Sequence, residues 1–506
     1  MNKILHIPLD ERPCNYEFPK QIFQGGEWEI LTLPFSYLGL KKKPAQIEKI
    51  QQWVLNNYQS AYGIVISIDM LLYGGIVPSR IHYFSFEELK ERLNILKLIK
   101  SKRPDFKIYA YNLVMRCPQY NDDDEEPSYY QNYGLNIFRH KYIEHKKSLN
   151  IATNEELEEE KQIFIPEEFV LDYETRRMTN LQVVLEVINL AKENIIDFLI
   201  IPQDDSAPYG YTALDQAQVA KKVNDNKLFF KILTYPGADE VSNTLFARLL
   251  NEYYNKRPLV YLFYPAEKAK TVIPCAEDRY LDISAKYQIL AAGCLFTPSL
   301  KDADLIFAIN APSKTMISSQ FRESSDDGYS VNRNLLDFIN FIDYCINVLN
   351  KPVCIGDVGY CNGGDLALIT LIEQKKMYLK LAGYASWNIP CNSLGTALPM
   401  GIRYLYPHDQ QLFNNFLIHR FVEDVGYCTL ARKILREQYC NDEFSIYDTK
   451  QMRGKFSELA KKIIIEQVNK YMPTLKDKYK ILDAYMPWIR TYEIGLKVIY
   501  TGDNDE

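Results

Sequence analysis

The chain has 506 residues, of which 47% are hydrophobic and 25% are charged, a composition ordinary for a folded, water-soluble protein. This length exceeds one common domain, so we expect two to four domains, or one barrel-sized domain with additions. The formal net charge of −6 argues against a nucleic-acid partner, because binding through phosphates needs a basic face.

The cysteines and the N-terminus indicate the compartment. Ten cysteines are scattered along the chain, and no two have the C-x-x-C spacing of zinc ribbons or redox motifs. Several lie in apolar runs, where thiols behave as small core side chains, as is typical of a reducing compartment. The N-terminal apolar run is too short for a signal peptide, and no window reaches the length of a membrane span. We therefore predict a cytoplasmic protein without a membrane partner.

Short apolar runs recur along the chain, each closed by polar residues, proline or glycine. Segments with helical spacing of apolar residues separate them, among them 86–102, 180–195 and 213–225. Continuous apolar strands that alternate with helices predict parallel sheets covered by helices. The predicted strands are 3–10, 28–34, 62–69, 107–116, 198–205, 230–240, 259–265, 303–312, 352–359 and 378–388.

These elements predict an α/β protein. We expect a (β/α)-barrel-like core or a related parallel-sheet core, with a mostly helical C-terminal region. Two doubly wound α/β domains around a cleft are the alternative, because spacing alone does not separate the arrangements. The expected regions are 1–260 and 261–404, both α/β, and a helical region over 405–506. The sequence shows no internal repeat, and the highly charged segment 120–165 is predicted to face solvent.

Polar side chains follow almost every predicted strand, where parallel α/β folds bind their ligands. A single Asp or Asn at such a position most often caps the next helix. Capping does not require pairs such as Asp204–Asp205 or Asp239–Glu240, or several arginines at the same edge. Trp387 with its neighbouring amides fits either a sugar subsite or a core position. The predicted substrate-binding residues are Asp10, Arg12, Asp69, Arg80, Arg116, Tyr209, Asp357, Asn362, Asp365, Trp387, Asn388 and Asn392.

The pair Asp204–Asp205 is the predicted catalytic centre. One carboxyl can be held ionised by a donor such as Arg116, while the other stays protonated and donates to a leaving oxygen. Two carboxyls in different environments perform glycoside hydrolysis. We expect Asp205 to be the general acid, with either Asp204 or, across the mouth, Glu240 or Asp239 as its partner. The sequence therefore predicts a carbohydrate-active hydrolase with a small-molecule substrate, a sugar.

Two other classes of function stay open. One is a divalent-metal hydrolase of a phosphate, amide or ester, with Mg²⁺ or Mn²⁺ held by Asp10, Asp69, Asp204 and Asp357. The other is a two-lobed small-molecule binding protein without turnover. No zinc site is predicted, because H-x-H and H-E-x-x-H are absent, and no nucleotide cofactor is predicted, because both glycine-rich phosphate motifs are absent. Oligomeric state is not predicted.

Six long stretches lie at these same strand ends. They are PLDERPCN (8–15), DMLLYGGIVPSR (69–80), PQDDSAPYG (202–210), YPGADEVSNTLFAR (235–248), DVGYCNGGD (357–365) and the run from SWN to NSLGTA (386–397). These stretches resemble a bacterial family known as domain of unknown function 4127. The resemblance extends over nearly the whole chain, through MPWIRTYE (486–493), and implies one integrated unit without implying an activity. One loop departs from the pattern that we expect of the family, with Ser386 before Trp387 in place of glycine.

Overall fold

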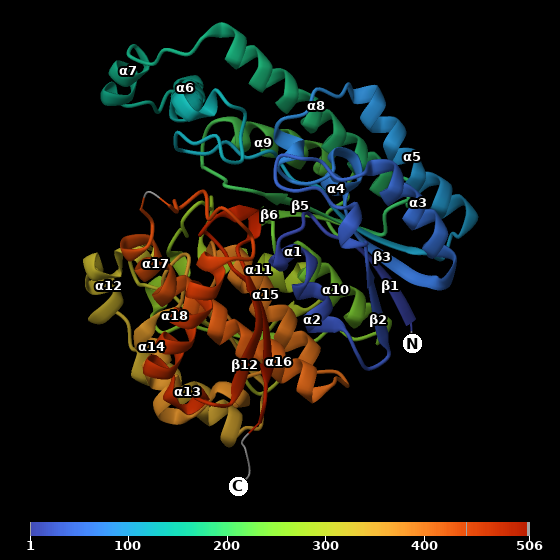
Figure 1. Ribbon diagram of the computed structural model, residues 1–506. Helices are drawn as coiled ribbons and strands as arrows, with labels where there is room; N and C mark the ends of the chain where they lie inside the picture. Colours follow the sequence, from blue (N-terminus) through green and yellow to red (C-terminus); the bar gives the residue numbers. More distant parts are fainter. Residues whose placement is uncertain (1, 442, 503–506) are drawn as a thin grey trace. The chain divides into compact units, whose positions relative to one another are not determined.

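A computed structural model describes residues 2–441 and 443–502 (Figure 1). The chain forms two compact units, each built from more than one segment. Unit 1 comprises Met1–Glu11, Glu29–Ser242 and Ala276–Asp278. Unit 2 comprises Arg12–Trp28, Asn243–Cys275 and Arg279–Glu506.

A six-stranded sheet forms the centre of unit 1, with the order β2-β1-β3-β4-β5-β6. The pairs β1–β3, β3–β4, β4–β5 and β5–β6 are all parallel. Every residue of β5 is buried, as expected of a central parallel strand. The strands are β1 (Asn2–Ile7), β2 (Trp28–Thr32), β3 (Ala61–Ser67), β4 (Lys107–Tyr111), β5 (Phe198–Gln203) and β6 (Ile232–Pro236).

Helices connect these strands and pack against one another in sequence, α4 on α5, α5 on α8 and α8 on α9. A capping box at Ser85 and Glu88 fixes the start of α5. The segment after β4 adds the short excursion α6–α7 before the long helix α8 (Figure 1). The helices are α3 (Ile47–Asn57), α4 (Ile68–Tyr73), α5 (Phe86–Lys102), α6 (Tyr130–Ser148), α7 (Asn154–Glu160), α8 (Glu167–Lys192) and α9 (Tyr211–Asp225), with the short 3-10 helix η3 (Pro78–Arg80).

A five-stranded parallel sheet forms the centre of unit 2, with the order β11-β10-β9-β7-β8. Helices α11 and α15 pack together, as do α13 and α14. The strands are β7 (Leu259–Phe263), β8 (Leu295–Phe296), β9 (Leu305–Asn310), β10 (Val353–Asp357) and β11 (Gly383–Ala385). The helices are α1 (Pro13–Tyr16), α2 (Phe18–Phe23), α10 (Val241–Tyr253), α11 (Leu281–Ala291), α12 (Asp327–Ser330), α13 (Leu335–Asn347), α14 (Leu366–Lys375) and α15 (Pro390–Tyr404).

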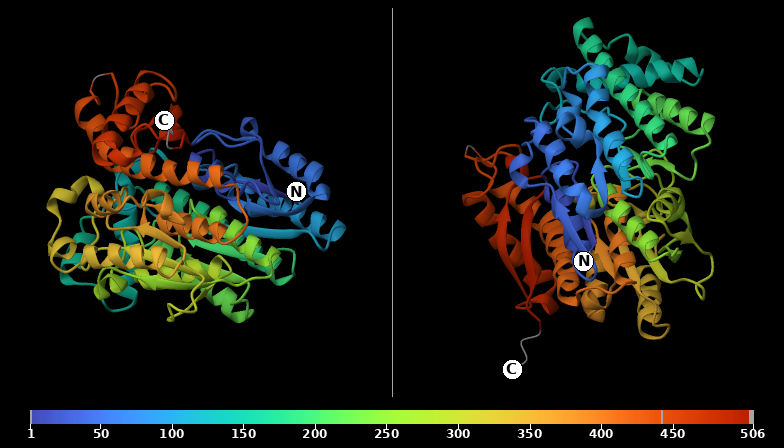
Figure 2. Two further views of the ribbon diagram at one scale, coloured as in Figure 1. Left: turned by 90° about the horizontal axis from the view of Figure 1, so that it is seen from below. Right: turned by 90° about the vertical axis from the view of Figure 1, so that its right-hand side faces the viewer.

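The C-terminal region belongs to unit 2 and is helical, as expected, but it also contains an antiparallel hairpin. The orange and red segments of Figure 2 show helices with two long strands beside them. The hairpin's short alternating runs give a weaker pattern than the helices around them. The elements are α16 (Gln410–Arg420), the π-helical η7 (Phe421–Ala431), α17 (Arg432–Gln438), α18 (Lys455–Tyr471), β12 (Tyr479–Tyr485) and β13 (Gly495–Tyr500).

The α/β class predicted from the sequence is confirmed, and each predicted strand overlaps one of β1–β7 or β9–β11, although several observed strands are shorter than predicted. Neither sheet of the described residues closes into a barrel; both are open. The two sheets also share one strand order, since β2-β1-β3-β4-β5 corresponds to β8-β7-β9-β10-β11. This doubly wound order places a topological switch point between β1 and β3 and another between β7 and β9, where open α/β sheets bind ligands.

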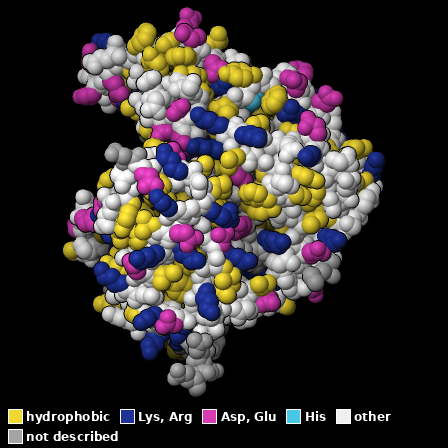
Figure 3. Space-filling view, viewed as in Figure 1, with side chains coloured by type: hydrophobic (Ala, Val, Ile, Leu, Met, Phe, Trp, Pro, Cys, Tyr) yellow, Lys and Arg dark blue, Asp and Glu magenta, His cyan; other side chains and the backbone are white. Residues whose placement is uncertain are grey.

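The surface shown in Figure 3 intersperses lysine and arginine with aspartate and glutamate. Within residues 2–441 and 443–502, no helix combines the length and the apolar character needed to cross a bilayer.

Candidate functional site

The sequence-predicted site residues fall into two groups, each within its own unit. The sequence predicts one pocket that all of these residues share. The unit 1 group is Asp10, Asp69, Arg80, Arg116, Asp204, Asp205, Tyr209, Asp239 and Glu240. The unit 2 group is Arg12, Asp357, Asn362, Asp365, Trp387, Asn388 and Asn392.

Two arginines hold the predicted catalytic pair in unit 1. Arg80, at the end of η3, donates from Nη2 to Asp204 Oδ2 at 2.8 Å. Arg116, which follows β4, donates from Nη1 to Asp205 Oδ2 at 3.0 Å. The two carboxylates directly follow β5. Side chains from the segments that follow three neighbouring strands, β3, β4 and β5, therefore meet.

Two further carboxylates, Glu125 and Glu126, complete this cluster. Arg80 Nη1 lies 2.8 Å from Glu125 Oε2, and Arg116 Nε donates to Glu126 Oε1 at 2.7 Å. Glu126 is only 1% exposed, so the prediction that segment 120–165 faces solvent is wrong at this position. The physical reason is the need of two buried guanidinium groups for counter-ions. The acidic run 122–126, close after Arg116, was the available sequence signal.

The two carboxyls of the pair lie in different environments. The Asp204 side chain is 11% exposed, whereas that of Asp205 is 26% exposed. Burial, followed by the charge of Asp205, raises the pKa of Asp204 to about 6. Asp205 has a φ of 39°, in the left-handed region that non-glycine residues rarely adopt. Such strained residues cluster at functional sites, where the surrounding structure holds them.

The switch point of the unit 1 sheet has its own buried acids, Asp10 after β1 and Asp69 in the first turn of α4. Asp69 Oδ2 accepts hydrogen bonds from Leu113 N at 3.0 Å and from Asn112 Nδ2 at 3.2 Å. Burial raises the pKa of Asp69 to about 6. Burial also raises the pKa of Tyr111 in β4, and the charges of Asp10 and Asp69 add to that rise.

The remaining unit 1 candidates lie on neighbouring turns. Glu240 is fully buried, and its Oε2 accepts a hydrogen bond from Ala238 N at 3.0 Å, within the turn after β6. A Cβ at Gly237 would lie 2.1 Å from Glu240 Oε1, so a larger residue there would displace the Glu240 carboxyl. The charge of Asp239 adds a smaller contribution to the raised pKa of Asp204, after burial and Asp205. Tyr209 packs edge-on against Tyr142 of α6, with ring centroids 5.4 Å apart.

The unit 2 group centres on Asp357 and Asp365. Asp365 is the N-cap of α14, where its side chain accepts a hydrogen bond from Ala367 N at 3.0 Å. This is the helix-capping role that an Asp after a strand most often has. Its other oxygen lies 2.6 Å from Arg333 Nη1. Asp357, at the end of β10, accepts hydrogen bonds from Tyr384 OH and Asn310 Nδ2, both at 2.8 Å. Burial, followed by the charge of Asp365, raises the pKa of Asp357 to about 7.

This raised pKa predicts a pH-dependent stability. The unfolded Asp357 carboxyl titrates near its ordinary pKa of 3.8, whereas the folded one titrates near 7. Between these values only the unfolded state releases the proton, so the contribution to the free energy of unfolding falls as pH rises, by about 1.4 kcal/mol per unit of pKa difference. We expect the stability of the wild type, relative to Asp357→Asn, to decrease from about pH 4 to about pH 7 in denaturant titrations. A pH-independent difference would mean that the folded carboxyl is ionised throughout.

The Trp387 loop is a core element with polar neighbours. Trp387 Nε1 donates to Thr396 Oγ1 at 3.1 Å, and its ring packs edge-on against Phe18. Of the two interpretations left open by the sequence, the core position therefore describes Trp387. Tyr492 OH lies 2.8 Å from the Oδ1 atoms of both Asn362 and Asn388, which both have a positive φ. Asn392 is buried.

Four buried charged residues on adjoining turns were missed from the sequence. They lie where α16 passes into the π-helical η7, and π-helical turns are often found at functional sites. Arg420 pairs with Glu423 and lies 3.0 Å from Asp424 Oδ1, while His419 Nε2 lies 2.8 Å from Glu423 Oε2. Asp424 Oδ2 accepts a hydrogen bond from Ser386 N at 2.7 Å. The run HRFVED (419–424) could have signalled this cluster, because its apolar neighbours predict a buried helix.

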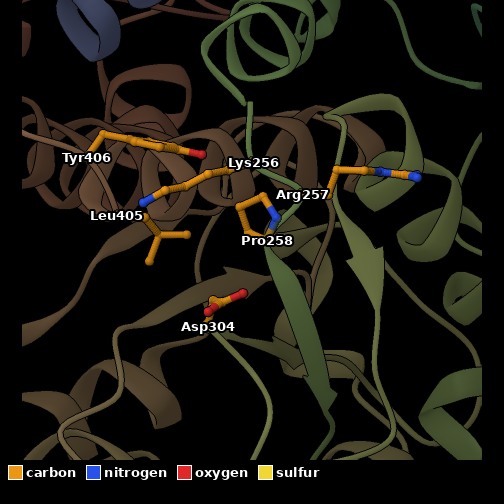
Figure 4. Close-up of a pocket in the computed structure, with 6 residues that line it drawn as sticks. All are labelled: Lys256, Arg257, Pro258, Asp304, Leu405 and Tyr406. Carbon is orange, nitrogen blue, oxygen red and sulfur yellow. The ribbon is translucent and has the colours of Figure 1, made fainter. Parts of the chain in front are cut away.

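Pockets lined by residues that the structure describes adjoin these elements. One in unit 2, of about 330 Å³, is lined by Asp304 and by 256–258 and 405–406 (Figure 4). It lies where β7 and β9 begin, and ligands bind at the opposite, carboxyl ends of parallel strands. The second, of about 20 Å³, is lined by Arg12, Trp387 and Asn388 among others and holds about one water-sized group. The third, of about 460 Å³, lies in unit 1 and is lined in part by Glu126.

The alternative hypothesis of a divalent-metal hydrolase used four aspartates as metal ligands, and these aspartates belong to different units. Asp10, Asp69 and Asp204 belong to unit 1, whereas Asp357 belongs to unit 2. In the described part of the chain, no group of three or more His, Cys, Asp or Glu side chains is placed to hold a metal ion.

Comparison with known proteins gives a family and no activity. The sequence profile of the family described as protein of unknown function DUF4127 matches residues 4–497, nearly the whole chain. No curated protein and no solved structure matches the chain significantly. The match confirms the family suggested by the strand-end sequences, and the chain belongs to DUF4127.

Proposed function

We propose that unit 1 is the catalytic part of a carbohydrate-active hydrolase, with Asp204 as the general acid and Asp205 as its carboxylate partner. The observation that supports this proposal is the pair itself: adjacent carboxyls at one strand end, each bound by a different arginine and buried to a different extent. The sequence alone favoured Asp205 as the acid. The raised pKa of Asp204 reverses the two roles.

The chemistry follows from the two environments. Asp204, protonated in part near neutral pH, donates its proton to the leaving oxygen as the glycosidic C–O bond breaks. The Asp205 carboxylate, paired with Arg116, stabilises the positive charge that develops on the sugar ring. Water supplies the hydroxyl of the new reducing end, and its proton returns to one of the two carboxylates. Both products are then neutral sugars, and the pair regains its starting protonation.

The surrounding charges set this balance. Arg80 and Arg116 alone would favour the ionised form of both aspartates. Glu125 and Glu126 each pair with both arginines and so share their positive charge. The cluster has two guanidinium groups and four carboxyls, so one carboxyl can keep its proton at little electrostatic cost. This is a second role for the acidic run that precedes α6.

Hydrolysis of nitrophenyl and alkyl glycosides tests the proposal. We expect release of the aglycone from at least one glycoside in a panel of pyranosides, by the full-length protein. We expect kcat/KM to fall as pH rises above about 6, because the acid must be protonated in the free enzyme. Initial rates between about pH 4 and 9 measure this profile. A chain that hydrolyses no glycoside under these conditions would contradict the proposal.

The repeated strand order favours one second candidate, a small-molecule binding protein built from two α/β lobes. Each doubly wound unit is suited to bind a small ligand at the carboxyl ends of its own strands. Saturable binding of a sugar without any turnover, measured by calorimetry and product analysis on the same sample, would favour this candidate over the hydrolase.

A further inference from the structure

The pocket of about 460 Å³ in unit 1 has the size of a small-molecule site. Its lining includes residues that follow η3, the turn before α6 and the first turns of α8. The lining includes Tyr83, Glu126, Tyr129, Phe169, Asp172 and Arg176.

Among the residues that the structure describes, two polar atoms of this lining are buried and have no hydrogen-bond partner. They are Glu126 Oε2 and Arg176 Nη1, on side chains whose residues are 1% and 3% exposed. The other atoms of both groups are engaged: Glu126 Oε1 with Arg116, and Arg176 with His82 O and Asp172. An unsatisfied buried polar atom costs about 1–3 kcal/mol, so each such atom in a folded protein calls for a partner. Among the lining residues, Glu126 therefore has one acceptor and Arg176 one donor without a partner, and both atoms are shielded from solvent.

The same pocket has an aromatic lining. Tyr83 is 87% exposed, and the Arg176 guanidinium lies 5.2 Å from its ring centroid. Tyr129 and Phe169 stack with centroids 4.7 Å apart, and Tyr129 OH donates to Asp172 Oδ2 at 2.7 Å. An exposed tyrosine ring offers a flat apolar face, and its hydroxyl offers a hydrogen bond.

The charged residues of the lining nearly balance, so the pocket should not strongly prefer either a cationic or an anionic ligand. Lys42 and Arg176 face Glu126, Glu168 and Asp172, which leaves a formal charge of −1. The ligand must supply donors to carboxylates, acceptors to a guanidinium and an apolar face to aromatic rings. A sugar combines these features, because each hydroxyl both donates and accepts and the ring's C–H groups form an apolar face.

We propose that this pocket binds a neutral sugar residue and is a substrate subsite of unit 1. The link to the catalytic pair is Glu126, whose Oε1 contacts Arg116 and Arg80, the arginines that hold Asp205 and Asp204. The role as a substrate subsite rests on the proposed function, whereas sugar binding at the pocket does not.

Calorimetric titration of the full-length Asp205→Asn protein tests the subsite without turnover. The probes are cellobiose, maltose, lactose and N,N′-diacetylchitobiose. We expect saturable binding of at least one of them, weakened tenfold or more by Tyr83→Ala and retained by Tyr83→Phe. Because Tyr83 is exposed, its replacement leaves the fold intact, which the thermal melting curve checks. The matched control is Tyr344→Ala, an exposed tyrosine of α13 in unit 2, which should bind as the parent does.

Three results would overturn the proposal: none of the four probes binds, Tyr83→Ala binds like its parent, or gluconate or spermidine binds at the Tyr83 site more tightly than every neutral sugar. Its failure differs from failure of the proposed function. Hydrolysis that needs Asp204, with a KM unchanged by Tyr83→Ala, would reject the subsite and leave the hydrolase. Binding that depends on Tyr83, without hydrolysis of any glycoside, would reject the hydrolase and leave the sugar site.

Discussion

Replacement of Asp204 by asparagine is expected to lower kcat/KM for an alkyl glycoside by about 10²–10⁴-fold, the usual contribution of a general acid. Asparagine keeps the shape of the side chain and removes the proton that the leaving oxygen needs. A nitrophenyl glycoside should lose much less, because nitrophenolate leaves readily without protonation. Parallel measurements on alkyl and nitrophenyl substrates of one sugar give this comparison directly.

Two further variants make the result specific. Asp205→Asn should slow both substrates, since its charge stabilises the sugar ring and not the leaving group. Asp215→Asn is the matched control, because Asp215 is also a buried aspartate of unit 1 that pairs with an arginine, Arg177 at 2.6 Å. It should retain the parent's selectivity between the two leaving groups. Equal losses on both substrates for Asp204→Asn would exclude Asp204 as the proton donor.

Replacement of Arg420 by methionine is expected to lower the free energy of unfolding of unit 2 by about 3–5 kcal/mol. Arg420 is completely buried and pairs with Glu423 and Asp424, so its loss leaves two buried carboxyls without their cation. Denaturant titration followed by tryptophan fluorescence measures the effect. Three of the four tryptophans, Trp28, Trp387 and Trp488, lie within the unit 2 segments, so the signal reports mainly on that unit.

The control is an arginine–aspartate pair of the same unit at the surface. Arg453 and Asp483 are 59% and 41% exposed, and Arg453→Met should change stability by less than about 1 kcal/mol. Adding Glu423→Gln and Asp424→Asn to Arg420→Met should restore much of the loss, because no uncompensated charge then remains. An Arg420→Met protein as stable as Arg453→Met would mean that the buried cluster is not held by this cation.

Local sequence patterns predicted single elements well. Helix α5 begins and ends at the predicted residues, 86 and 102, because the capping box and the basic last turn mark both ends. The strands were found because each is a continuous apolar run. The order of strands in the sheets was not predictable in this way, because the positions of apolar runs along the chain do not determine which strands pair.

The site was predictable in part. Arg80, Arg116, Asp204 and Asp205 come together because parallel strands end at one edge, a rule that the sequence can use. Glu126 was missed because an acidic run is ordinarily solvated, and only the burial of two arginines elsewhere in the chain reverses that expectation. The shared strand order of the two sheets was not predictable from the sequence either. Right-handed crossover connections can give two sheets the same strand order without similar residues in them.

The left-handed backbone at Asp205 determines which replacements there are informative. Asparagine adopts this conformation more readily than most residues, so Asp205→Asn changes the chemistry and leaves the turn undisturbed. A β-branched residue such as valine would add about 1–2 kcal/mol of backbone strain and confuse misfolding with lost reactivity. Glycine would relieve the backbone strain at this turn. An Asp205→Gly protein that is inactive but melts at a higher temperature than its parent would show that the Asp205 carboxyl is needed for the reaction and not for folding.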